Sequence, residues 1–244
     1  MGATGKPART TPAKITPLVS VLLTNYYFLT PHTFNMKQLV FTLALAFSCL
    51  VAHAQNFEGK IVYRNTYKSN TPGLSDGQLN ALLGDVQNWY TKGGDYRSEV
   101  NGTQLVWQLY RNSENKLYSK FAGSEKLLWN DGASNPDSVL STTLRKGATE
   151  IMGYQCDELT LVCRSGVQKY YFSPRLPVDR DLYKAHRFGN WYAYLSKAGA
   201  VPLKMVIETP QFSMESVATG VHPLKLSNTL FALPADAQTS KSPY

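Results

Sequence analysis

From residue 57 onward, short runs rich in Tyr, Trp, Val and Thr alternate with turn-forming residues at short intervals. Such runs suit a pleated, half-buried strand, and closely spaced turns join neighbouring strands into antiparallel hairpins. In the run from Phe57 to Tyr67, Phe57, Ile61 and Tyr63 share one face. A sheet of about ten such strands cannot stay open and flat. The pattern therefore predicts a mainly β fold whose antiparallel sheet curls into a barrel or half-barrel, or splits into a sandwich.

Three local signals interrupt this pattern. Asn101-Gly102 between two apolar runs predicts a two-residue hairpin turn. Residues 76–83 and 191–197 predict two short helices, the second ended by Gly199. Residues 236–244 are polar and terminal, which predicts a flexible tail. We therefore expect a single β-rich domain over residues 55–235, with one or two short helices.

Residues 36–54 read as a secretory signal peptide. Lys37 forms a charged start, an apolar run covers Leu39 to Phe47, and Ala52-His53-Ala54 makes a small-x-small cleavage site before Gln55. The apolar run is far shorter than the ~20 residues that a membrane-spanning helix needs. We therefore expect a periplasmic or secreted protein that does not span the membrane.

The segment before this signal is expected to lie outside the fold. Residues 1–35 are rich in Pro and Thr, and we interpret them as an untranslated or disordered leader, with Met36 as the initiator. Cys49 raises the alternative of a lipoprotein. Phe47 stands where lipid attachment wants a small residue, so this alternative is the weaker one.

Removing residues 1–54 halves the net charge. The remaining 190 residues hold all 17 acidic residues and 21 of the 25 Lys and Arg, so the net charge falls from +8 to +4. The remaining charge is scattered rather than gathered in a basic stripe. We therefore expect no nucleic-acid partner.

Metal and redox chemistry find little support in the sequence. After the signal, only Cys156, Cys163, His186 and His222 remain as soft ligands, in unrelated contexts. The two cysteines are seven residues apart in one expected strand, about 23 Å, and an odd spacing points them to opposite faces. A disulfide needs Cα atoms within about 7 Å, so we expect no bond between them, and neither a metal nor a cofactor.

Ser75 is the sharpest catalytic candidate, because Gly73-Leu74-Ser75-Asp76-Gly77 matches the G-x-S-x-G motif of hydrolases. That motif needs a parallel sheet already built around it. Ser75 followed three residues later by Gln78 equally fits a helix capping box. We prefer the capping interpretation, expect no catalytic residues, and keep a hydrolase that uses Ser75 as an alternative.

Large aromatic residues are numerous for a sheet of this size. They can fill a core, or line an apolar cavity on the concave face of a curled sheet. Sequence alone does not separate these two roles. The candidate ligand-binding residues from this set are Tyr63, Trp107, Trp129, Tyr170, Phe172 and Trp191.

Four segments carry a family resemblance: Phe57 to Tyr63, Ile151 to Cys156, Gly199 to Met205 and Leu230 to Pro234. Together they resemble an exported family of domains of unknown function (DUF4412-like), which is similar to the lipoprotein-carrier superfamily of LolA and LolB. The resemblance implies a half-open antiparallel barrel, with short helices as a lid over an apolar concave face that can hold acyl chains.

These observations favour a non-catalytic periplasmic binding protein that holds a lipid, an acyl chain or another apolar ligand. One alternative is an envelope module with a filled core that binds a partner protein through its sheet or loops. The unrecognised hydrolase is the other.

Overall fold

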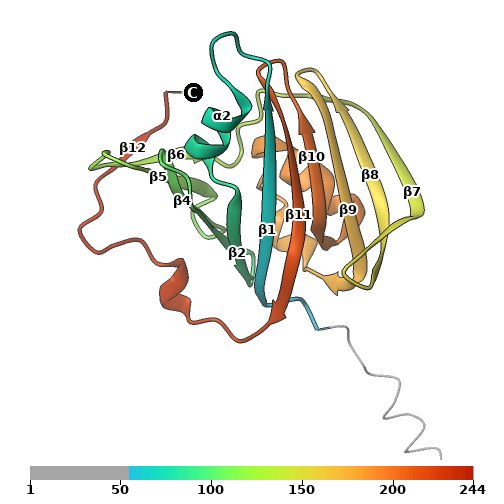
Figure 1. The fold of residues 1–244 in the computed structure, drawn as a ribbon. Coiled ribbons are helices and arrows are strands. Elements are labelled where there is room, and N and C mark those ends of the chain that lie inside the picture. The colour runs from blue at the N-terminus through green and yellow to red at the C-terminus, as the bar shows by residue number, and fades with distance from the viewer. Residues whose placement is uncertain (1–54, 244) are drawn as a thin grey trace, which may run out of the picture. The chain divides into compact units, whose positions relative to one another are not determined.

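Twelve strands form one sheet, in the order β12-β6-β5-β4-β3-β2-β1-β11-β10-β9-β8-β7 (Figure 1). The structure, a computed structural model, describes residues 55–243, so the expected leader and signal peptide lie outside the described residues. Neighbouring strands are antiparallel except β12 and β6, which are parallel. The strands are β1 (Gly59–Ser69), β2 (Val86–Lys92), β3 (Asp95–Val100), β4 (Leu105–Arg111), β5 (Lys116–Phe121), β6 (Leu127–Asp131), β7 (Val139–Ile151), β8 (Tyr154–Cys163), β9 (Gly166–Pro177), β10 (Ala200–Glu208), β11 (Phe212–Pro223) and β12 (Thr239–Lys241).

The sheet is strongly curved but does not close, because β12 and β7 each end it without pairing to one another. This confirms the expected mainly β class with a curved antiparallel sheet. The strands differ in length, from three residues in β12 to 13 in β7. One edge of the sheet is therefore a short strand, β12, and the other edge is a long strand, β7.

Helix α3 (Trp191–Ala198) lies on the concave side and joins the two halves of the sheet, and it is drawn in orange behind β10 and β11 in Figure 1. Its Trp191 ring packs against Trp89 of β2 and Tyr96 of β3. One turn later, Tyr194 stacks on Tyr170 of β9. Gly199 ends the helix in the left-handed conformation, as the sequence predicts.

The C-terminal segment covers the convex face of β4 to β6 (Figure 1). Leu226 and Phe231 pack on Leu109, Tyr118 and Leu127, which the strand alternation turns away from α3. The chain then adds β12 beside β6. Within the segment expected to be a flexible tail, 236–244, the structure therefore places residues 239–241 in the sheet. Burial of apolar residues upstream brings this strand to the sheet edge.

The two-residue hairpin expected at Asn101-Gly102 is wrong. Pairing of β3 with β4 stops at Glu99 opposite Trp107, so the connection is longer. The loop instead docks on helix α2 (Asp76–Leu83), whose Ala81 and Leu82 carbonyls accept the N–H groups of Thr103 and Gln104. These bonds satisfy carbonyls that a helix C-terminus leaves without partners. The loop that contains Asn101-Gly102 therefore caps the C-terminus of α2 rather than forming a tight hairpin turn.

Replacing Gly102 by alanine is expected to lower the free energy of unfolding by about 2 kcal/mol. A Cβ atom there would lie 2.5 Å from the Leu82 carbonyl oxygen, which is backbone and cannot swing away. Gly77 is the matched control, because a Cβ atom there meets nothing within 4 Å. Gly77→Ala should stabilise α2 by about 0.5 kcal/mol. Urea unfolding of both variants measures the difference, and equal midpoints would contradict the close approach.

Candidate ligand-binding site

A hollow of about 320 Å³ opens on the concave face beside α3, and we call it the concave hollow. Strands β1 to β4, β10 and β11 form its floor and walls, with one residue from each helix. It is lined by Tyr63, Asn65, Tyr67, Leu83, Gln87, Trp89, Tyr96, Ser98, Val100, Leu105, Gln108, Trp191, Pro202, Met205, Ile207, Phe212 and Met214. The lining is mainly aromatic and aliphatic, with a few polar side chains among them, which is the usual composition of a small-molecule site.

A second hollow of about 680 Å³ lies next to the first, over β4 to β6. Gln108 lines both hollows, so they are neighbours on the same face of the sheet. Apolar Phe121, Leu128 and Phe188 contribute to its wall, while Asp131 and Lys241 bring charge to it. The concave face therefore continues from an uncharged inner hollow into a wider one that contains charged side chains.

Strand alternation keeps charge out of the concave hollow. On β1, Tyr63, Asn65 and Tyr67 line it. The residues between them point to the other face, and one of them, Arg64, forms an ion pair with Asp85 there. On β3 and β10, too, uncharged side chains face the hollow and charged ones face away from it. This separation follows from the alternation of side chains along each strand.

Polar side chains form a continuous row across six adjacent strands of the concave face. We call this set the polar row: Ser216, Asn65, Gln87, Ser98, Gln108 and Ser119, on β11, β1, β2, β3, β4 and β5. The Ser216 hydroxyl donates to Asn65 Oδ1. Gln87 Nε2 donates to Ser98 Oγ at 2.9 Å, and Gln108 Nε2 donates to Ser119 Oγ at 3.1 Å. These bonds fix the orientation of the Asn65, Gln87 and Gln108 amides.

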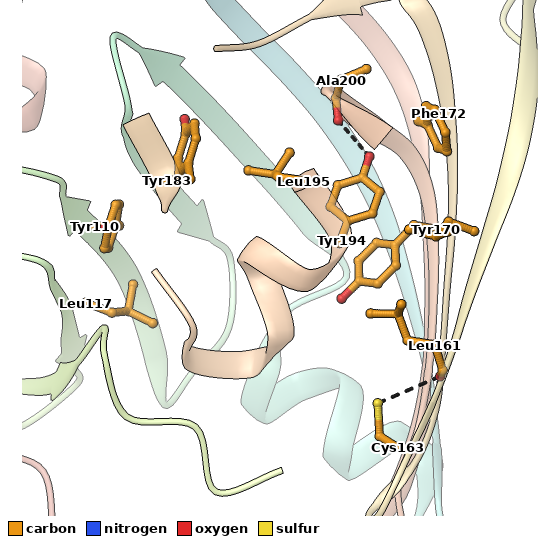
Figure 2. Packing of buried hydrophobic residues seen from close by; sticks show 11 residues of the cluster. Tyr110, Leu117, Leu161, Cys163, Tyr170, Phe172, Tyr183, Tyr194, Leu195 and Ala200 are labelled. Carbon is orange, nitrogen blue, oxygen red and sulfur yellow. Dashed lines mark hydrogen bonds between the residues drawn. The ribbon is translucent and has the colours of Figure 1, made fainter. Parts of the chain in front are cut away.

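A packed aromatic core fills the other part of the concave side, beneath α3 (Figure 2). Tyr194 is fully buried, its ring centroid is 4.2 Å from that of Tyr170, and its hydroxyl donates to the Ala200 carbonyl at 2.7 Å. Phe172 meets the Tyr194 ring edge-on at 6.1 Å. The concave side is thus filled at one end and hollow at the other.

His186 is buried at the edge of this core. Its Nε2 lies 2.9 Å from the Tyr96 hydroxyl, and its ring stacks on Tyr110 with centroids 3.9 Å apart. Nδ1 finds no hydrogen-bond partner among residues 55–243. Burial lowers the pKa of His186 to about 3, so the imidazole is neutral at physiological pH. On the floor of the hollow, burial raises the pKa of Tyr67 to about 12, which keeps that phenol neutral too.

The six aromatic residues selected from the sequence fall into three groups. Tyr63 and Trp191 line the concave hollow. Tyr170 and Phe172 are buried in the core beneath α3 and lie outside the lining of both hollows. Trp107 and Trp129 form the third group, outside the concave hollow. Only one third of the set therefore reaches the hollow.

Trp107 and Trp129 lie on the convex face, against the C-terminal segment. Register explains this, since Trp107 shares a face with Leu109, which pairs with Tyr118, which in turn pairs with Trp129. The Arg97 guanidinium lies 4.7 Å from the Trp107 ring centroid, a cation–π contact. These two tryptophans are therefore separated by the sheet from Tyr63 and Trp191.

Several lining residues were missed from the sequence, chiefly the amides and hydroxyls of the polar row. A signal for them does exist: Asn65 alternates with Tyr63 and Tyr67, and Gln87 with Trp89, on one strand face each. When a neutral polar residue alternates with aromatic residues on the same strand face, that part of the face is expected to contact a polar group rather than the hydrophobic core.

Ser75 caps α2. Its Oγ accepts the Gln78 N–H at 3.2 Å, and Gln78 Oε1 accepts the Ser75 N–H at 2.8 Å, which is the expected capping box. His186, the histidine that would follow it in the order of a hydrolase triad, is hydrogen-bonded to Tyr96 instead. The geometry gives Ser75 a structural role.

Cys156 and Cys163 are both free and buried, in two different core clusters. Both side chains are buried, although their odd spacing on β8 predicts opposite faces. Among residues 55–243, no group of three or more His, Cys, Asp or Glu could hold a metal ion. The described helices are also too short or too polar to cross a membrane.

No family model matches the chain, and no curated protein matches it. An uncharacterized conserved protein from Thermus thermophilus aligns with a TM-score of 0.44 at 10% identity, over 82% of this chain and 99% of that one. A LolA superfamily protein, NE2245 from Nitrosomonas europaea, gives 0.34 at 10%, over 73% and 91%. LprF from Mycobacterium bovis gives 0.29 at 12%, over 70% and 88%.

One of these neighbours carries the LolA superfamily name that the sequence resemblance implies. The narrower resemblance to a DUF4412-like family is unsupported, since no family model matches. At this level of identity and TM-score, the neighbours transfer neither a ligand nor an activity to this chain.

Proposed function

We propose that this chain is an exported, non-catalytic binding protein that holds a lipid or another apolar ligand in its concave hollow. The observation that carries the proposal is an open, uncharged hollow with an aromatic and aliphatic lining, placed directly beside a well-packed core. Apolar surface left in contact with water costs free energy. Aromatic side chains fill one end of the concave face, so the same sheet could also be filled at its other end, and the open hollow there is a feature to be explained by a ligand. The two neighbouring hollows together offer room for a ligand of lipid size.

Export to the periplasm or outside the cell is part of this proposal. It rests on the signal-peptide pattern of residues 36–54, with cleavage before Gln55. Residues 1–35 are then absent from the working protein, and 55–235 form its single domain. An apolar ligand that must cross an aqueous compartment requires a carrier whose cavity shields it from water.

Native mass spectrometry of protein exported by a Gram-negative host tests both parts of the proposal. The denatured protein should have the mass of residues 55–244, and the native protein should carry an additional mass that organic extraction recovers as a lipid. Val100 lines the hollow, so Val100→Trp should fill it and abolish the additional mass. Val106 is exposed and does not line it, so Val106→Trp should retain the ligand. Wild-type protein without any ligand would contradict the binding proposal.

A second candidate, an envelope protein-interaction module, is favoured by the free edge at β7. This strand ends the sheet, and its residues 140–147 are all exposed. Leu140 and Leu144 are among the most exposed apolar side chains, at 66% and 44%. From Val139 to Leu144 the strand has no charge and no proline, the usual protections of an edge. A partner could add an extended strand there. If native mass spectrometry finds the protein free of ligand, the result would favour this interaction module over the binding protein.

A further inference from the structure

The polar groups that line the concave hollow are all uncharged. Its 17 lining residues include two glutamines, an asparagine and a serine, but no Asp, Glu, Lys, Arg or His. Burying an ionised group without a charged partner costs several kcal/mol, whereas a neutral polar group needs only a hydrogen bond. The hollow can therefore accept a ligand that is polar at one point, provided that this point carries no charge.

Gln87 and Gln108 supply the hydrogen bonds that such a ligand needs. Each carboxamide uses one N–H in a bond across the sheet, Gln87 to Ser98 and Gln108 to Ser119. A carboxamide has two N–H donors, so one remains on each glutamine. The bonds already made hold both amides in place, which lowers the entropy cost of meeting a ligand.

The aromatic residues stand on the same strands as these amides. Tyr63 and Tyr67 flank Asn65 on β1, and Trp89 follows Gln87 on β2, all facing the hollow. The Tyr63 hydroxyl is itself occupied, donating to the Pro202 carbonyl at 2.6 Å. A ligand whose polar group reaches the polar row therefore places its hydrocarbon against aromatic faces and methionine side chains.

We propose that the ligand is an uncharged amphiphile, with a hydrocarbon chain against this aromatic wall and an ester, amide or hydroxyl group at the polar row. This inference rests on the binding function proposed above and adds a selection: neutral acyl esters or amides are preferred over the free fatty acid. An ionised carboxylate in the hollow would lose its hydration without meeting a cation.

The test compares three probes of the same acyl chain: methyl oleate, 1-monooleoylglycerol and oleate, at about pH 8 where the carboxyl is ionised. Binding to the delipidated mature protein is followed by tryptophan fluorescence, since Trp89 and Trp191 line the hollow. Both esters should bind at least about tenfold more tightly than oleate, given the cost of a buried charge. Oleate binding equal to or tighter than that of the esters would overturn the selection and leave the binding function intact. If none of the three probes binds, both proposals fail.

Variants separate the polar row from general hydrophobicity. Replacing Gln87 and Gln108 together by leucine removes the remaining donors, so the ester preference should shrink to about threefold or less. Asn88 is the matched control, because it lies on the opposite face of β2 and lines neither hollow. Asn88→Leu should retain the full preference. A preference unchanged in the double variant would overturn the role of the polar row, and circular dichroism establishes that the variants fold.

Discussion

Truncating Tyr194 to alanine is expected to lower the free energy of unfolding by about 4 kcal/mol, close to the upper end for a buried aromatic residue. Tyr194 is completely buried and contacts Tyr170, Phe172 and Trp191. The truncation would leave a cavity among these rings and would remove a hydroxyl that holds the Ala200 carbonyl at 2.7 Å. Because Tyr194 joins α3 to β9 and the start of β10, its loss also weakens the attachment of α3 to the sheet.

Two control variants divide this effect into its parts. Tyr194→Phe keeps the ring and loses only the hydrogen bond, so it should cost about 1 kcal/mol. Tyr192 lies on the same helix but is only partly buried. Tyr192→Ala should therefore cost clearly less than Tyr194→Ala. Guanidinium unfolding followed by tryptophan fluorescence measures all three, and a loss of similar size at positions 192 and 194 would argue against Tyr194 as the anchor of α3.

The strands were largely predictable because a half-buried strand shows its period directly. The strand expected at residues 57–67 corresponds to β1 (Gly59–Ser69), whose burial alternates as expected. Helix α2 and its capping box were also readable, since the signal is local. The turn at Asn101-Gly102 and the tail at 236–244 were not. Both depend on partners distant in the chain, α2 in one case and β6 in the other. A local sequence pattern sets the conformational preference of a segment, but contacts with distant parts of the chain decide which structure the segment adopts.

The candidate site was harder to predict than the fold, because large aromatic residues face both sides of this sheet. Tyr63 and Trp107 look equivalent in sequence, yet one lines the concave hollow and the other packs beneath the C-terminal segment. Which face of β4 is concave depends on the register of the whole sheet and on the bulge between Leu105 and Trp107. Which end of the concave face is filled depends on where α3 lies. Neither can be deduced from a single strand.

Acidification should destabilise the protein through His186 well before its carboxylates protonate. Burial lowers the pKa of His186 from 6.5 to about 3 in the folded protein, and the unfolded chain should have the ordinary value. Between these two values the unfolded state binds the proton and the folded state does not. Proton uptake by the unfolded state therefore lowers the free energy of unfolding as the pH falls below about 6.5, by about 1.4 kcal/mol per pH unit. Above pH 6.5 the contribution of His186 should be flat.

The pH window distinguishes His186 from the acidic groups. Asp157 is an example: its burial opposes ionisation, but hydrogen bonds from Lys146 and from the Gly147 N–H outweigh this and lower its pKa. Asp157 therefore loses its stabilising contribution only as the pH falls below about 4. The phenols that contact His186, Tyr96 and Tyr110, do not titrate in this range, since burial raises the pKa of both.

Urea unfolding at intervals between about pH 7 and pH 4.5 measures the slope directly. The wild type should lose about 3 kcal/mol over this range, mostly below pH 6.5. His186→Gln is smaller and uncharged, so it should be less stable at neutral pH but should show almost no slope in the same interval. His222 is exposed, and His222→Gln should keep the wild-type slope. A slope that survives in His186→Gln would place the proton uptake elsewhere. A slope that disappears only there would show that the packing of His186 against β3 and β4 keeps the imidazole neutral in the folded protein.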